Sequence, residues 1–290
     1  MKTFTRAAEM QTASLSLRRG GKSIGFVPTM GALHEGHLSL VRRARQESDV
    51  TVASVFVNPA QFGPAEDYRN YPRDPARDAQ LLEREGVDFL FAPPVEEMYP
   101  PNFQTYATVE KVSAPLEGEF RPGHFRGVAT VVLKLFNIIQ PHRAYFGQKD
   151  AQQCVVIRRM VRELNLPVEI VVCPIVREPD GLALSSRNYY LNGEERRAAR
   201  VLYRSLCRAR ELIEKGERRT EAIVREIRQL IDREPHTRLD YVAVVHADTL
   251  EPVARVAGAT LIPLAVWIGR ARLLDNLLIE ESDGRLTFQL

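Results

Sequence analysis

The sequence feature that most constrains the fold is an apolar segment that runs directly into a glycine-containing loop and then into a helical pattern. The apolar segment covers residues 24–27, the loop covers residues 28–37, and apolar residues at helical spacing begin at Leu38. A strand that leads through a tight loop into a helix is the repeating unit of α/β folds, in which helices cover a parallel sheet. We therefore expect this loop at the carboxyl end of a parallel strand.

The loop has the composition of an anion-binding site. The start of a helix presents unpaired N–H groups and roughly half a positive charge, and Gly31 and Gly36 carry no side chain that would keep a phosphate away. His34 and His37 are three residues apart, so in a helical turn both lie on one side and can donate to the same phosphoryl group. We interpret the loop as a site for the α-phosphate of a nucleotide.

Two other interpretations of the histidine pair stay open. In one, a histidine caps the helix or packs beside it while the other faces solvent. In the other the pair binds zinc, but zinc proteases have the order His-Glu-x-x-His, with the ligands four residues apart. Here the interval is three and no third ligand is evident. No protein-bound metal is predicted.

Strand and helix patterns alternate up to about residue 175. Strand patterns cover residues 24–27, 50–57, 87–91, 143–146 and 168–173, an extended stretch covers 106–112, and helical patterns begin at 36 and cover about 75–85, 126–139 and 150–165. Right-handed crossovers between such strands give a doubly wound parallel sheet. The predicted fold class is α/β, with a Rossmann-like, nucleotide-binding domain over residues 1–175.

The pattern changes beyond this point. Two long helices rich in arginine and glutamate cover about 193–215 and 220–233, and strands follow at 239–246, 260–268 and 273–280. Residues 176–290 are therefore predicted to form a second, smaller α+β domain. Because Pro174, Pro179 and Gly181 punctuate the connection, we expect a hinge or a lid there.

Composition indicates a globular protein with a full core. Of the 290 residues 44% are hydrophobic, no apolar run approaches the roughly 18 residues of a membrane span, and residues 1–14 lack the apolar core of a secretory signal. We expect a cytoplasmic protein that does not bind membranes. Cys154, Cys173 and Cys207 have no metal-binding spacing and are predicted to be buried free thiols.

Arginine dominates the positive charge. There are only six lysines among the 40 basic residues, yet the net charge is +3 because 37 acidic residues interleave with the arginines, as in Glu194-Glu195-Arg196-Arg197. This pattern favours an ion-paired, solvated helix surface and no nucleic-acid partner. A tRNA- or RNA-binding module stays the non-enzymatic alternative.

Two further segments carry phosphate-binding chemistry. Lys149 and Asp150 stand where a strand ends, so the ammonium can reach a phosphate and the carboxylate a ribose hydroxyl. The Ser185-Ser186-Arg187 segment follows the predicted hinge, and its hydroxyls and guanidinium suit the β- and γ-phosphates of a nucleotide. Both segments are also compatible with ordinary surface turns.

Two glutamines and one glycine-rich segment complete the candidates. Gln61 and Gln153 carry amides that can donate to a substrate carboxylate or hydroxyl without neutralising the charge of the nucleophile, and each is also compatible with an ordinary surface position. Asn58 begins the turn that contains Gln61 and is compatible with a purely structural role. Residues 120–127 form either a moving flap or a helix entry, and His124 within them is given no catalytic role.

Six segments together resemble one family, in the order in which the family has them. They read VPTMGALHEGH, VNPAQFG, YPRD, RPGHFRGVATVV, YFGQKDAQQ and LSSRNYYL. The chain resembles the pantothenate synthetases, the ATP-dependent pantoate–β-alanine ligases of the His-x-Gly-His nucleotidyltransferase superfamily. The HEGH segment resembles the superfamily signature, whereas GQKDAQQ and RPGHFRG are more specific to the family.

The resemblance implies a two-step ligation. Pantoate attacks the α-phosphorus of ATP and releases pyrophosphate, and the amine of β-alanine then attacks the pantoyl adenylate and releases AMP. The product is pantothenate, in the coenzyme A pathway. Mg²⁺ is expected on the phosphates of ATP, with no tightly bound cofactor, and the protein is expected to be a homodimer.

The resemblance also implies roles for individual residues. His37 is the expected proton donor, and the other expected catalytic residues are His34, Lys149, Arg187 and Asn58. Pantoate is expected at Gln61 and Gln153, and β-alanine at Gln61. The expected ATP-binding residues are Met30, Gly31, Ala32, Leu33, His34, Glu35, Gly36, His37, Gly147, Gln148, Lys149, Asp150, Val176, Leu184, Ser185, Ser186 and Arg187.

One position departs from the family pattern. Leu184 stands where the family usually has methionine before Ser-Ser-Arg, which keeps the bulk of the side chain but loses the thioether. A nucleotidyltransferase that makes a dinucleotide is the alternative enzyme, because it shares the histidine loop but uses a phosphate as its second substrate.

Overall fold

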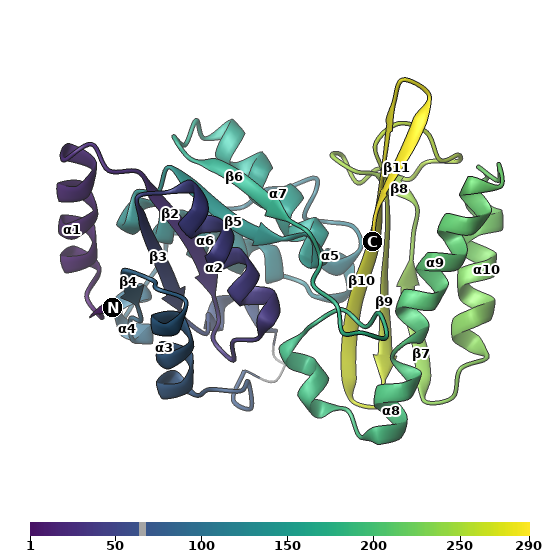
Figure 1. Cartoon of the computed structure of the whole chain (residues 1–290), viewed down its shortest axis with the longest axis horizontal. Coiled ribbons are helices and arrows are strands. Elements are labelled where there is room, and N and C mark those ends of the chain that lie inside the picture. The colour runs from purple at the N-terminus through teal and green to yellow at the C-terminus, as the bar shows by residue number, and fades with distance from the viewer. Residues whose placement is uncertain (64–67) are drawn as a thin grey trace. The chain divides into compact units, whose positions relative to one another are not determined.

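The fold is described from a computed structural model of the chain, which describes residues 1–63 and 68–290 (Figure 1). The chain divides into two compact units. The first consists of Met1–Gly147 and Gln152–Cys173, and the second consists of Gln148–Ala151 and Pro174–Leu290.

Parallel strands form the centre of the first unit. In the described part of the chain they are β1 (Lys2–Phe4), β2 (Ile24–Thr29), β3 (Val50–Val55), β4 (Phe89–Phe91), β5 (Arg143–Gly147) and β6 (Glu169–Cys173). Their order in the sheet is β1-β4-β3-β2-β5-β6, and every neighbouring pair is parallel. The predicted doubly wound sheet is confirmed.

Helices cover both faces of this sheet. Successive residues of a strand point to opposite sides, and here neighbouring residues are both apolar, so each face buries its side chains under helices. Phe26 and Phe91 pack with α1, α6 and α7 on one face, whereas Val27 and Leu90 pack with α2 and α3 on the other. All four side chains are buried, and burial of each contributes about 1.5–3 kcal/mol. The helices and short 3-10 turns are α1 (Ala7–Arg19), α2 (Glu35–Glu47), η1 (Pro59–Gln61), α3 (Pro75–Arg84), α4 (Val95–Met98), α5 (Glu117–Phe120), α6 (His124–Ile139), η2 (Gln148–Asp150) and α7 (Ala151–Glu163).

The strand order reverses between β2 and β5. From β2 the sheet extends through β3, β4 and β1 on one side, and β5 and β6 lie on the other. In doubly wound sheets ligands bind outside the carboxyl ends of the two strands at this switch point. Those ends are Thr29 in β2 and Gly147 in β5, so the loop that contains both histidines leaves the sheet at the switch point.

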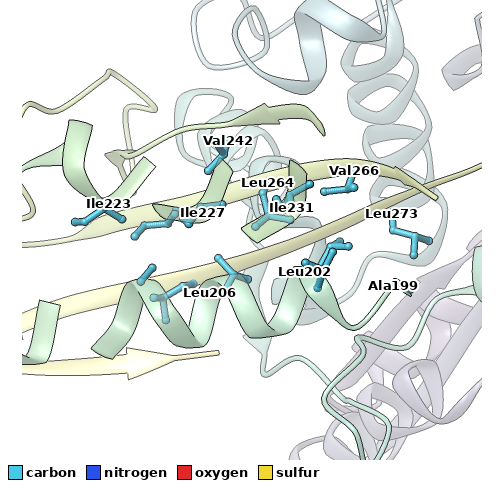
Figure 2. Close-up of a cluster of buried hydrophobic side chains, with 14 of the residues drawn as sticks. Ala199, Leu202, Leu206, Ile223, Ile227, Ile231, Val242, Leu264, Val266 and Leu273 are labelled. Atoms are coloured by element: carbon cyan, nitrogen blue, oxygen red, sulfur yellow. The ribbon is translucent and has the colours of Figure 1, made fainter. Parts of the chain in front are cut away.

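The second unit is an antiparallel sheet with two long helices packed against it (Figure 1). Figure 2 shows Leu202 and Leu206 of α9 with Ile223, Ile227 and Ile231 of α10 in one buried cluster. The isoleucines recur every fourth residue, so they form a single stripe on α10. The elements are η3 (Ser186–Tyr190), α8 (Gly193–Ala198), α9 (Val201–Glu214), α10 (Thr220–Asp232), β7 (Thr237–Val242), β8 (Val245–His246), β9 (Thr260–Ile268), β10 (Ala271–Ser282) and β11 (Arg285–Gln289).

Two sequence predictions differ from the structure in detail. The helix expected over 193–215 is interrupted, because Ala199 and Arg200 form a turn between α8 and α9. The stretch expected to be extended over 106–112 forms no strand: residues 106–109 have no regular secondary structure, and turns follow. The boundary predicted at residue 175 and the role of the second unit as a lid stay predictions.

Candidate active site

A tight turn follows β2 and positions the histidine loop. The Thr29 hydroxyl donates to the Ser54 carbonyl at 2.7 Å and accepts the Gly31 N–H at 3.2 Å. Gly31 and Ala32 then have φ values of +82° and +50°, in the left-handed region. Glycine fits the first of these positions without steric cost, and alanine at the second is unusual. The backbone therefore turns sharply between the strand and the helix.

The Asp78 carboxylate, from α3, holds this turn. Its Oδ2 accepts the Ala32 N–H at 3.0 Å and its Oδ1 accepts the Leu33 N–H at 2.9 Å. Asp78 is 1% exposed, and burial raises the pKa of its carboxyl while the two N–H groups act in the opposite direction. A side chain at Gly31 would place Cβ only 2.8 Å from Oδ2. Asp78 is therefore a site residue that the sequence reasoning missed.

His34 and His37 lie against each other at the start of α2. His34 precedes the helix with an extended backbone, and the two ring centroids are 4.1 Å apart. The His34 N–H donates to Nδ1 of His37 at 3.4 Å. Because Nδ1 accepts a hydrogen bond, a neutral His37 carries its proton on Nε2. Both residues are partly exposed, so the expected phosphate donors lie together at a helix N-terminus.

Asn58 and Gln61 form a buried amide pair after β3. Nδ2 of Asn58 donates to Oε1 of Gln61 at 2.9 Å and to the Gly127 carbonyl at 3.1 Å, and its Oδ1 accepts from the Tyr99 hydroxyl at 2.7 Å. Nε2 of Gln61 is 3.3 Å from Sδ of Met30. The structure thus brings Met30, Asn58 and Gln61 together. Both amide hydrogens of Asn58 bond within the protein, so this geometry supports a role that fixes Gln61.

The start of α6 supports the same turn. Nδ1 of His124 lies 2.9 Å from the Gln61 carbonyl oxygen. A Cβ at Gly127 would lie 2.2 Å from the Ala60 carbonyl oxygen, so η1 rests directly on the helix backbone. Gly123, with φ +83°, precedes the helix. The segment over 120–127 is therefore a helix entry in this structure, and His124 is a second residue that sequence reasoning left without a role.

The start of α7 carries the second glutamine expected to bind pantoate. Gln153 is partly exposed, and its neighbour Gln152 is buried. Gln152 accepts the Glu117 N–H and donates to the carbonyls of Val112 and Pro115 at 3.0 and 2.8 Å. Gln152 thereby ties the chain before α6 to the helix that presents Gln153.

The remaining candidates belong to the second unit. Val176 and Leu184 are the ends of a hairpin, since the Leu184 N–H donates to the Val176 carbonyl at 3.0 Å. Next to it, Ser185 Oγ accepts the Arg187 N–H at 3.2 Å and caps the start of η3. In η2, Nζ of Lys149 lies 3.5 Å from Oδ1 of Asp150. The segment expected to be a hinge is therefore a hydrogen-bonded hairpin.

The structure thus gathers the predicted residues into two groups, one in each unit. The first contains Met30 to His37, Asn58, Gln61, Gly147 and Gln153, and the second contains Gln148 to Asp150, Val176 and Leu184 to Arg187. Within residues 1–63 and 68–290, no group of three or more His, Cys, Asp or Glu side chains could hold a metal ion. Among those same residues no helix is long and apolar enough to cross a membrane.

Comparisons with known proteins agree with this geometry. The family model described as pantoate-beta-alanine ligase matches residues 2–278. A pantothenate synthetase of Caldicellulosiruptor bescii is 58% identical over 97% of this chain and 99% of its own. The crystal structure of pantothenate synthetase from Thermus thermophilus has a TM-score of 0.90 and 52% identity, covering 96% of this chain and 99% of that one.

A further solved structure contains bound molecules. It is the pantoate-beta-alanine ligase of Francisella tularensis, in complex with beta-gamma ATP and beta-alanine. Its TM-score is 0.78 and its identity 35%, over 96% of this chain and 97% of that one.

Proposed function

The chain belongs to the pantoate–beta-alanine ligase family, and from its function as the ligase that joins pantoate to β-alanine with ATP we propose how its residues divide the chemistry. The observation that carries the proposal is the adjacent pair His34 and His37 at the N-terminus of α2. The loop that carries the pair follows β2 at the switch point of the sheet, where such folds bind nucleotides. We assign the α-phosphate of ATP to this place.

In the first step an oxygen of the pantoate carboxylate attacks the α-phosphorus. The bond from that phosphorus to the bridging oxygen breaks, and pyrophosphate leaves. A carboxylate is already ionised at pH 7, so the step requires positioning and charge neutralisation rather than a base. His34 and His37 donate to the phosphoryl oxygens, and these bonds strengthen as charge develops.

In the second step the β-alanine amine attacks the acyl carbon of pantoyl adenylate. A C–N bond forms, the bond between the acyl carbon and the phosphate oxygen breaks, AMP leaves, and the amine releases a proton. Gln61 and Gln153 are assigned to pantoate, and Gln61 also to β-alanine. The buried Asn58–Gln61 pair supports this, because Asn58 fixes which end of the Gln61 amide faces the substrate.

The second unit supplies groups for the outer phosphates. Lys149 and Arg187 neutralise charge on the β- and γ-phosphates, and Ser185 and Ser186 bind them through hydroxyl or backbone groups. Gly147, Asp150 and Val176 are assigned to adenosine. Mg²⁺ enters on the phosphates of ATP, since Mg²⁺ is usually held by phosphates, water and one or two carboxylates. The Francisella tularensis complex supports ATP and β-alanine as ligands.

Two properties of the whole protein complete the proposal. Cys154, Cys173 and Cys207 are free thiols, and such thiols persist in a reducing compartment, which supports a cytoplasmic location. A homodimer is the expected assembly, and sedimentation tests it: a single species of about twice 32.9 kDa agrees, and a monomer at assay concentration contradicts it.

Isotope transfer tests the adenylate route directly. The enzyme is incubated with Mg²⁺, ATP, β-alanine and pantoate that carries ¹⁸O in its carboxylate, and AMP is analysed by mass spectrometry. Attack by the carboxylate on the α-phosphorus moves one labelled oxygen into AMP, and pyrophosphate–ATP exchange then requires pantoate but not β-alanine. Unlabelled AMP, or ADP as the nucleotide product, would overturn the route.

A further inference from the structure

Two adjacent residues of β10 bond to the turn that carries Lys149 and to the hairpin that precedes Ser185. They are Asp275 and Asn276, which are 2% and 1% exposed. Successive residues of a strand point to opposite faces, so one such pair can reach two different segments. Neither residue lies in a motif that points to chemistry.

Asn276 holds the turn that carries Lys149. Its Nδ2 donates to the carbonyl oxygens of Gln148 and Lys149 at 3.0 and 3.1 Å, and its Oδ1 accepts from Nε2 of Gln148 at 3.1 Å. These three bonds use both amide hydrogens of Asn276. A buried carboxamide whose donors are used in this way fixes the two peptide units that flank Lys149.

Asp275 holds the hairpin that leads to Ser185, Ser186 and Arg187. Its two carboxylate oxygens accept from the two terminal nitrogens of Arg177 at 2.7 and 2.9 Å. The same Arg177 donates to the Gly181 carbonyl at 3.0 Å, across the turn of the hairpin. Oδ1 of Asp275 also accepts the Asn276 N–H at 2.8 Å, so the Asp275 side chain is bonded both to Arg177 and to the backbone of Asn276.

The local sheet allows this use of the strand. Asn276 lies opposite Pro263 of β9, and proline has no N–H to donate to the ladder. The Asn276 carbonyl therefore receives no ladder bond from residue 263, and the Asn276 N–H bonds to the neighbouring carboxylate rather than to β9. At this point β10 therefore bonds to the Lys149 turn and to the hairpin, and it also pairs with β9.

We propose that Asn276 is a positioning residue for Lys149, and that Asp275 and Asn276 together fix the relative placement of the Lys149 turn and the Ser185–Arg187 segment. This inference rests on the proposed role of Lys149 toward the phosphates of ATP. Asn276 acts through the backbone of η2 and does not itself contact substrate. Displacement of a charged group by about 1 Å is enough to cost up to about a hundredfold in rate.

A double-mutant cycle tests the proposal. Asn276→Leu, which keeps the size but removes the three bonds, is made in the full-length enzyme with Lys149 and with Lys149→Ala. With Lys149 present, kcat/KM for ATP is expected to fall about 10- to 100-fold. In the Lys149→Ala background the same change is expected to cost less than about threefold, because the group that Asn276 positions is absent. The activity of the slow variants is measured by the release of radiolabelled AMP.

A matched control separates positioning from general stability. Ser205→Ala removes another buried hydrogen bond of the second unit, from the Ser205 hydroxyl to the Leu202 carbonyl at 2.9 Å. It is expected to lower the melting temperature while kcat/KM stays within about twofold in both backgrounds. If Asn276→Leu fails to fold, Asn276→Ser, which keeps one hydroxyl donor, takes its place in the cycle.

The outcomes are distinct. Equal losses from the Asn276 variant in both backgrounds, or no loss in a folded protein that contains Lys149, would overturn the inference. If Lys149→Ala alone leaves kcat/KM unchanged, the proposed function of Lys149 is wrong and the inference falls with it. A large loss with Lys149 and a small one without it supports both.

Discussion

Asp78 accepts the backbone N–H of Leu33 at 2.9 Å, although the two residues are 45 positions apart in the chain. The same carboxylate accepts the Ala32 N–H, so one buried side chain of α3 shapes the turn that presents the histidine pair. A fixed carboxylate acceptor resists displacement of the turn more strongly than a neutral one would, because hydrogen bonds to charged groups are the stronger ones. The position of His34 therefore depends on a residue outside the loop.

Asp78→Ala is expected to lower both stability and activity. Two buried N–H groups lose their acceptor, at about 1–3 kcal/mol each before relaxation, and kcat/KM is expected to fall at least about tenfold because the turn loses its support. Urea unfolding and steady-state kinetics measure the two effects. Asp74→Ala is the matched control: it removes a cap of the same helix, whose Oδ1 accepts the Arg77 N–H at 3.0 Å, and leaves the turn alone. A stability loss with unchanged kcat/KM in Asp78→Ala would contradict the positioning role.

The two amide replacements of His37 are expected to differ. Alanine at either His34 or His37 should reduce kcat at least about a hundredfold, as loss of a transition-state donor does. Because Nδ1 of His37 accepts the His34 N–H, the atom left to donate to phosphate is Nε2. Glutamine places its NH₂ near the position of Nε2, whereas asparagine places its amide near Nδ1. His37→Gln should therefore keep more activity than His37→Asn in a pyrophosphate-release assay. The reverse order would show that the tautomer assignment is wrong.

Gly127→Ala is expected to raise KM for pantoate. The new Cβ would lie 2.2 Å from the Ala60 carbonyl oxygen and 2.5 Å from the Gln61 nitrogen, so η1 must move. Such overpacking typically costs about 1–3 kcal/mol of stability and here displaces Gln61 as well. Gly193→Ala is the control, since its Cβ meets only the end of Arg197 at 3.9 Å. A crystal structure of Gly127→Ala with η1 unmoved and an unchanged KM would rule the explanation out.

The sequence predicts the parts of this fold whose signal is local. The strand expected over 260–268 is β9 residue for residue, because nine successive residues there are apolar or small and eight of them are buried. The loop between β2 and α2 is also recognisable, because its glycines and histidines are close in sequence. In contrast α1 was not predicted: its core-facing stripe has only two large apolar side chains, Met10 and Leu17, beside two alanines, so the periodic signal is weak.

The supporting residues of the site are harder to predict, because each acts across a long stretch of chain. Asp78 bonds to Ala32, which is 46 residues away in the chain. His124 bonds to Gln61 at a separation of 63 residues, and Asn276 bonds to Gln148 at a separation of 128. A weak signal exists for Asp78. It lies four residues before Leu82, on the buried face of α3, where an isolated carboxylate is costly unless backbone donors meet it. That pattern indicates a buried acceptor but not its partner.

His142 is expected to make folding stability fall in mild acid. Its Nδ1 accepts the Ile24 N–H at 3.0 Å, at the start of the central strand β2. Burial lowers the pKa of His142 below its ordinary value of 6.5, and the nearby Arg18 and Arg143 lower it further. The unfolded chain therefore binds the proton at a higher pH than the folded one. The contribution of His142 to stability is complete above about pH 6.5 and is lost as the pH falls through the folded-state pKa.

His142→Asn, which keeps an acceptor near Nδ1 but does not titrate, separates this effect from that of the carboxylates. Urea unfolding of both proteins between pH 8 and pH 5 should give free energies whose difference changes only below about pH 6.5, in favour of the variant. Parallel curves over the whole range would show that His142 takes up its proton equally in both states.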